Sequence, residues 1–153
     1  RCACEYGHES IARWLHSLGG VNVHALNDNA FRWACQNGHE RVAGWLHSLG
    51  GVDVHAQGDQ AFRFACSEGH ESLARWLHSL GGVNTHAAND WAFKVACCNG
   101  HESIARWLHS LGGVDVHALN DHAFRWACQN GHESIAQWLD SLGGVAVHAG
   151  DAL

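Results

Sequence analysis

The chain has 153 residues, of which 46% are hydrophobic, enough for one modest domain. Nine Lys and Arg residues against fifteen Asp and Glu residues give a formal net charge of −6, which argues against a surface for nucleic acid or for an anionic membrane, because such a surface needs clustered positive charge. The apolar runs are only a few residues long, so no segment is expected to span a bilayer.

A repeat of 31 residues organises the whole sequence. Cysteine, glycine and tryptophan recur at this step in five copies, at Cys4, Cys35, Cys66, Cys97 and Cys128, at Gly7, Gly38, Gly69, Gly100 and Gly131, and at Trp14, Trp45, Trp76, Trp107 and Trp138. The repeats are 1–31, 32–62, 63–93, 94–124 and 125–153. They leave no segment for a second domain, so the period predicts a single solenoid in which each repeat contacts its neighbours.

Each repeat is expected to form a helix, a second helix and an extended loop. In the clearest copy, Asp28 is a good N-cap for the first helix, and Gly38 ends that helix. A second helix is expected from about Glu40 to Leu49, because its apolar residues follow the i, i+3, i+4, i+7 spacing. The segment from Val52 to Ala56 alternates like a short extended stretch. Both helices are too short to be stable alone, so stacking must stabilise them.

This pattern resembles the ankyrin repeat along the whole chain. The residues Asn29–Cys35 match the family's T-P-L-H-x-A-A segment, Gly38–Leu46 match G-H-x-x-I/V-V-x-x-L-L, and Val54–Ala56 match the final V-N-A. Alanine replaces the family's proline, Arg or Lys replaces its first histidine, and the loop is shorter. The sequence is similar to the divergent ankyrin arrays of giant viruses, algae and other protists. The resemblance implies an all-α, ankyrin-like solenoid of about five helical hairpins, with short loops in place of full β-hairpins.

Each repeat also carries a Cys-x-x-Gly-His run that invites comparison with a zinc site. Zinc needs four converging ligands, whereas equivalent residues of stacked helices lie ~8–10 Å apart. We therefore expect no metal and no other cofactor, with buried cysteines and with histidines in the local hydrogen bond that the resemblance implies. Cys98 stands where other repeats have Gln36, Ser67 or Gln129, and we expect an exposed, oxidisable thiol. Seven cysteines without paired spacing favour a reducing, intracellular compartment, cytoplasmic or nuclear.

Two further histidine columns run along the chain. One begins at His16 on the second helix and the other at His24 in the loop. We interpret both as solvated or loop-bonded side chains. The alternative is a pH sensor or a metal-binding role: protonating all fifteen histidines would change the formal charge from −6 to +9 and make the columns repel.

Positions that differ between repeats predict a partner-binding surface, which the resemblance places on the turn tips and first helices. Trp91 is expected to be its exposed anchor, because its counterparts are polar. Tryptophans such as Trp14, Trp33 and Trp126 are instead expected in the core. Divergence can also reflect free drift of surface residues. The candidate partner-binding residues are Leu26, Asn29, Gln36, Gln57, Gln60, Glu68, Trp91, Cys98, Leu119, His122 and Gln129.

The two ends of the sequence lack the polar capping repeats typical of solenoids. Excision from a longer array and end-to-end stacking of copies are both open, and stacking would make open filaments. No nucleophile–base set or phosphate loop interrupts the repeats, so we expect no enzymatic activity and no catalytic residue. The expected function is a protein-binding scaffold, with a self-assembling array as the alternative. The candidate stacking residues are Cys2, Tyr6, Trp126, Ile135, Trp138 and Leu153.

Overall fold

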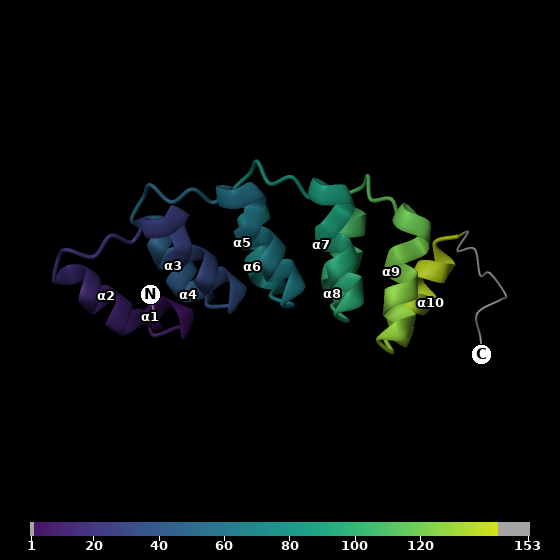
Figure 1. Ribbon diagram of the computed structural model, residues 1–153, viewed down its shortest axis with the longest axis horizontal. Coiled ribbons are helices and arrows are strands. Elements are labelled where there is room, and N and C mark those ends of the chain that lie inside the picture. The colour runs from purple at the N-terminus through teal and green to yellow at the C-terminus, as the bar shows by residue number, and fades with distance from the viewer. Residues whose placement is uncertain (1, 144–153) are drawn as a thin grey trace. The chain divides into compact units, whose positions relative to one another are not determined.

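Helical hairpins make up the described part of the chain, which in this computed structural model is residues 2–143 (Figure 1). No strand occurs in that range. The helices are α1 (Cys2–Glu5), α2 (Glu9–Ser17), α3 (Ala25–Gln36), α4 (Glu40–Ser48), α5 (Ala56–Ser67), α6 (Glu71–Ser79), α7 (Ala87–Cys98), α8 (Glu102–Ser110), α9 (Ala118–Gln129) and α10 (Glu133–Ser141). The expected all-α class and the helix–helix–loop order of each repeat are confirmed.

The chain divides into two bodies, residues 1–84 (the N-terminal body, α1–α6) and residues 85–153 (the C-terminal body, α7–α10). In the N-terminal body the first helices pack in series, with α3 between α1 and α5, and each first helix packs on its own second helix. In the C-terminal body α7 packs on α9 in the same manner. No helix among residues 2–143 combines the length and the apolar character needed to cross a membrane.

The core of each body consists of the same columns of the repeat. Phe31, Phe62 and Phe93 on the first helices are almost completely buried, as are the second-helix residues Val42 and Ile104. The expected cysteine column is buried at Cys4, Cys35, Cys66 and Cys97, and burial raises the pKa of the Cys66 thiol to about 12. The periodic apolar pattern therefore identified the buried faces correctly.

In α3, α5, α7 and α9 the second, third and fourth residues have left-handed backbone angles, and the right-handed part of the helix follows them. Leu26, Asn27 and Asp28 have φ angles of 59°, 55° and 56°, and the Asp28 N–H donates to the His24 carbonyl at 3.2 Å. Three consecutive left-handed residues are unfavourable for L-amino acids unless other contacts hold them. The expected extended segment is absent from the described loops, and Asp28 is not a conventional N-cap, because its backbone is left-handed and its carboxylate bonds elsewhere.

Backbone strain at Leu26 predicts a stabilising substitution. Leu26 is 74% exposed, so Leu26→Gly removes little packing and relieves the left-handed strain, and we expect a gain of about 0.5–1 kcal/mol. Leu18 is a matched control, because it is also exposed but has a right-handed φ of −72°; Leu18→Gly is expected to give no gain. Urea unfolding followed by circular dichroism measures both. Equal effects of the two variants would contradict the assignment of strain to the turn.

Expectations about the burial of Cys98, Cys128, Trp14, Trp33 and Trp126 are wrong. Cys98 is buried rather than exposed, because Asn130 Nδ2 and His132 Nε2 from the following hairpin donate to its carbonyl and bring that hairpin over it. Cys128 is exposed, since no described helix covers that side of α9. Trp126 is 44% exposed, and Trp14 is 60% exposed although its counterpart Trp45 is 6% exposed. Trp33 is only half-buried.

Candidate functional site

The first-helix face of the N-terminal body is held together by Arg32. Its guanidinium donates to the Leu26 carbonyl at 2.8 Å and to the Asn27 carbonyl at 3.0 Å, both in its own left-handed turn. It also donates to Oε1 of Gln57, at 3.1 Å, and to Oε1 of Gln60 on the next hairpin. Arg32 therefore connects three of the predicted partner-binding residues, and the fork geometry of its side chain allows it to serve several acceptors at once.

Two depressions lie on this face. The first has a volume of about 330 Å³ and is lined by Asn29, Arg32, Trp33, Gln36, Gln60 and Phe64. The second has a volume of about 400 Å³ and is lined by His24, Asn27, Asp28, Asp53, Ala56 and Gln57. The predicted residues Asn29, Gln36 and Gln60 thus gather around one depression and Gln57 lines the other. Glu68 is exposed at the end of α5 and lines neither.

The first-helix face of the C-terminal body has a different chemistry. His122 and Trp126 on α9 stack with ring centroids 4.9 Å apart. Trp91 on α7 is half-buried, so its expected full exposure is wrong. Leu119 and Gln129 are exposed at the two ends of α9. The sequence placed Trp126 in the core and among the stacking candidates, not on the partner-binding surface; the feature that could have pointed to it is that its first-helix counterparts differ, as Trp33, Phe64 and Val95.

Nearby groups change the pKa values of His122 and Cys98 in this body. Burial lowers the pKa of His122, and the nearby charges of Lys94 and Arg125 lower it further. Its Nδ1 is buried and has no hydrogen-bond partner among the described residues. Burial raises the pKa of the Cys98 thiol, and the charge of Lys94 opposes that effect. Lys94 therefore lies within electrostatic reach of both His122 and Cys98.

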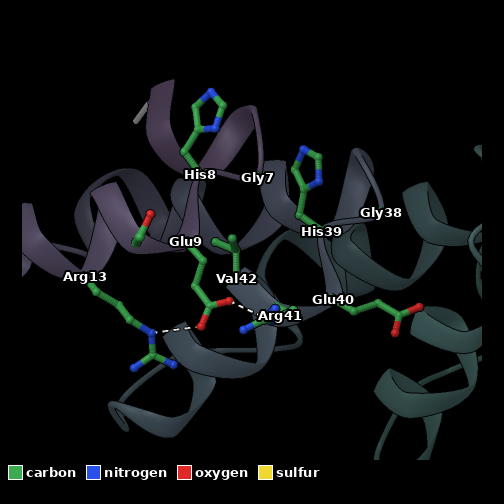
Figure 2. A pocket seen from close by; sticks show the side chains of 10 residues that line it. Gly7, His8, Glu9, Arg13, Gly38, His39, Glu40, Arg41 and Val42 are labelled. Carbon is green, nitrogen blue, oxygen red and sulfur yellow. Dashed lines mark hydrogen bonds and ion pairs between the residues drawn. The ribbon is translucent and has the colours of Figure 1, made fainter.

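A larger pocket, of about 750 Å³, lies at the second-helix N-termini of the N-terminal body (Figure 2). At its centre Glu9 accepts bonds from Arg13 at 2.9 Å and from Arg41 at 2.8 Å. None of the predicted site residues lines this pocket. The sequence feature that could have indicated this pocket is Arg41, which stands where every other repeat has serine. Because both arginines already bond to Glu9, the pocket offers a neutralised cluster rather than an uncompensated charge.

The Gly-His histidines make hydrogen bonds between repeats. His39 Nε2 bonds to the Glu5 carbonyl at 2.9 Å, and His70 and His132 bond in the same way to Gln36 and Cys98 at 3.0 Å. The local hydrogen bond that the ankyrin resemblance implied is therefore wrong, because these histidines bond to the preceding hairpin.

The other two histidine columns also contact neighbouring groups. His24 Nδ1 bonds to Oδ1 of Asp28 at 2.6 Å, and the other oxygen of Asp28 accepts the backbone N–H of Asp53 from the next loop at 2.9 Å. His16 packs edge-on against Trp45, with ring centroids 5.8 Å apart. Within residues 2–143 no three His, Cys, Asp or Glu side chains gather closely enough to hold a metal ion.

Protonation of His117 strengthens its hydrogen-bonded pair with Asp121. The hydrogen bond to Asp121 raises the pKa of His117, and the charge of Asp121 adds to the effect. A folded-state pKa above the unfolded value of about 6.5 stabilises the fold fully below that pH, and the contribution is lost as pH rises through the folded pKa. We expect His117→Gln to reduce the loss of stability between about pH 6 and about pH 8. Urea unfolding at each pH tests this, and an unchanged or steeper loss would contradict it.

The candidate stacking residues differ in their exposure. Ile135 is buried inside the last hairpin, and Trp138 faces the preceding one, with Arg106 4.7 Å from its ring centroid and His109 edge-on at 5.6 Å. Neither fits an exposed end face. Tyr6 is exposed, and Trp126 lies on the first-helix face. Leu153 and the side chain of Cys2 lie outside the described residues.

Comparison with known proteins agrees with this geometry. A family model for ankyrin repeats, in three copies, matches residues 1–89 and again residues 63–149. No curated protein matches the sequence. Ankyrin repeats are generally scaffolds for protein–protein interaction and are typically non-enzymatic. With the hairpin order of each repeat and the glycine–histidine contacts between repeats, the match shows that the chain belongs to the ankyrin-repeat family.

Proposed function

We propose that this chain is a non-enzymatic scaffold that binds a protein partner through its first-helix faces, and that residues 1–153 form a single ankyrin-repeat array. The observation that carries the proposal is that positions identical in every repeat and positions that vary between repeats have different roles in the structure. The invariant Gly, His and Cys columns are used in contacts within and between repeats. The residues that vary, such as Gln60 and His122, lie on the first helices instead.

The chemistry of these faces supports a peptide-like partner. The depression beside Gln60 combines amide groups with the aromatic rings of Trp33 and Phe64, a mixture typical of protein-binding surfaces. The C-terminal body presents Trp91, His122 and Trp126. Aromatic residues are among the types that most often anchor a protein interface. The free thiols Cys35 and Cys66 support an intracellular, reducing compartment.

A random-peptide display library selected on the intact chain tests this function. Selected peptides should bind about tenfold or more weakly to Trp91→Ala or Gln60→Ala, because these substitutions remove contact residues of the first-helix faces. Gln137→Ala is the matched control, since Gln137 is exposed on the second helix α10, and it should bind as the wild type does. Peptides that are unaffected by both first-helix substitutions, or a selection that yields no binder, would overturn the proposal.

A second candidate function is end-to-end self-association. The face of α2 that carries Ile11 and Trp14 is exposed, whereas the counterparts Val42 and Trp45 on α4 are buried. Because α2 packs on α4, the exposed face has the shape and apolar character that another repeat of this kind covers. Light scattering tests the idea: the wild type should associate with rising concentration, and Trp14→Glu should not. A wild type that stays monomeric at high concentration would exclude this function.

A further inference from the structure

The basic position of the first helix is an arginine, Arg32, on α3 of the N-terminal body and a lysine, Lys94, on α7 of the C-terminal body. In the N-terminal body Arg32 is saturated by two turn carbonyls and two glutamine oxygens. The corresponding residue of the C-terminal body is Lys94, which is only 8% exposed. A lysine ammonium cannot reproduce the forked contacts of a guanidinium. Within the described part of the C-terminal body, Lys94 makes no hydrogen bond or ion pair.

Three carboxylates of this body are engaged by other partners. Asp121 bonds to His117 at 2.6 Å, and Glu102 bonds to Arg106 at 2.7 Å. Asp90 bonds to His86, also at 2.6 Å. Among the described residues of this body no carboxylate pairs with Lys94, and a largely buried cation without an anion is unfavourable.

The residue beside the basic side chain also differs between the two bodies: it is a hydrogen-bond acceptor in the N-terminal body and a donor in the C-terminal body. Gln60 supplies the oxygen that accepts from Arg32, whereas the corresponding residue beside Lys94 is His122. Because Nδ1 of His122 is buried, Nε2 is the ring nitrogen that can bond to a group outside the chain. Lys94 and His122 thus present two donors at a place where the N-terminal body pairs a donor with an acceptor. The missing element is a negatively charged acceptor.

The aromatic surroundings favour a peptide as the source of that acceptor. Trp126 is 44% exposed and stacks on His122, so an apolar residue next to the acceptor has a surface to cover. Nucleic acid needs many clustered positive charges, whereas the chain has only nine Lys and Arg residues against fifteen Asp and Glu residues. This inference rests on the proposed scaffold function. We propose that the C-terminal body binds an aspartate or glutamate side chain of an acidic partner segment with apolar flanking residues. Lys94 and His122 are the donors, and Trp126 is the aromatic surface that the flanking residues cover.

Display selection against the wild type and Lys94→Gln provides the test, with circular dichroism to verify folding. We expect the wild type to select peptides rich in Asp and Glu, and counterparts with each acidic residue replaced by its amide should bind about tenfold more weakly. Lys94→Gln should weaken the acidic peptides by a similar factor, and Lys94→Arg should largely restore them. Arg75→Gln removes a positive charge from the second helix α6, outside the first-helix faces, and should leave their binding unchanged.

The outcomes separate this inference from the function on which it rests. Peptides that lose affinity for Trp91→Ala but tolerate both amide replacement and Lys94→Gln would overturn acidic recognition and leave the scaffold function standing. Peptides that do not respond to Trp91→Ala or to Gln60→Ala would overturn the scaffold function itself. Equal losses in Lys94→Gln and Arg75→Gln would indicate a general charge effect and would also overturn the assignment to Lys94.

Discussion

Gly38→Ala should destabilise the N-terminal body by about 2–4 kcal/mol, the largest effect we expect from adding a single methyl group. Gly38 has a φ of +72°, which costs alanine about 1–2 kcal/mol. An added Cβ would also lie 2.6 Å from the His70 ring. That ring would have to move, and its hydrogen bond to the Gln36 carbonyl, 3.0 Å long, would be lost. Urea unfolding of the intact chain followed by circular dichroism measures the loss.

Gly50→Ala is the matched control for this prediction. Gly50 has a φ of +79°, but an added Cβ would meet nothing within 4 Å. We therefore expect only the backbone cost, about 1–2 kcal/mol. The difference between the two variants isolates the contact between repeats from the backbone strain. Equal losses for Gly38→Ala and Gly50→Ala would show that the contact with His70 contributes nothing.

Asp28→Ala should cost about 2–3 kcal/mol, because the carboxylate joins two successive loops. One oxygen of Asp28 accepts from His24 Nδ1 at 2.6 Å and the other accepts from the Asp53 N–H at 2.9 Å. Asp28 is buried, so its removal leaves two donors without an acceptor. The measurement is again the free energy of unfolding in urea.

Asp53→Ala tests whether the carboxylate of Asp28 itself is responsible. The Asp53 side chain accepts only the local His55 N–H, at 3.0 Å, and is exposed, while its backbone N–H remains available to Asp28. We expect a loss of about 0.5 kcal/mol. If Asp53→Ala were as damaging as Asp28→Ala, the link between loops would not be the source of the stability.

The buried columns could be predicted from the sequence because burial repeats with the same period as the residues. Phe31, Phe62 and Val42 follow apolar spacings that one helix face requires. The left-handed turn at Leu26 could not be predicted in this way, since leucine has no preference for positive φ. Its conformation is fixed by groups outside the turn, namely Arg32 and the loop of the next repeat.

The candidate site was predicted in part for a similar reason. Comparing repeats located Asn29 and Gln60, which line the same depression. It gave the wrong exposure for Cys98 and missed the exposed ring of Trp126. Exposure in a stacked array depends on which groups of the next hairpin reach a residue, such as His132 over Cys98, and a column of aligned residues does not contain that information.

Stacking of successive 31-residue hairpins is tested most directly by amide hydrogen exchange at Asp53 and Asn84. Both amides lie in loops, and their acceptors are the carboxylates of Asp28 and Asp59 in the preceding repeat, at 2.9 and 3.2 Å. We predict that NMR finds both amides protected, and that Asp28→Ala removes the protection of Asp53 while sparing Asn84. Exchange of both amides at the rate of an unstructured loop would contradict the account.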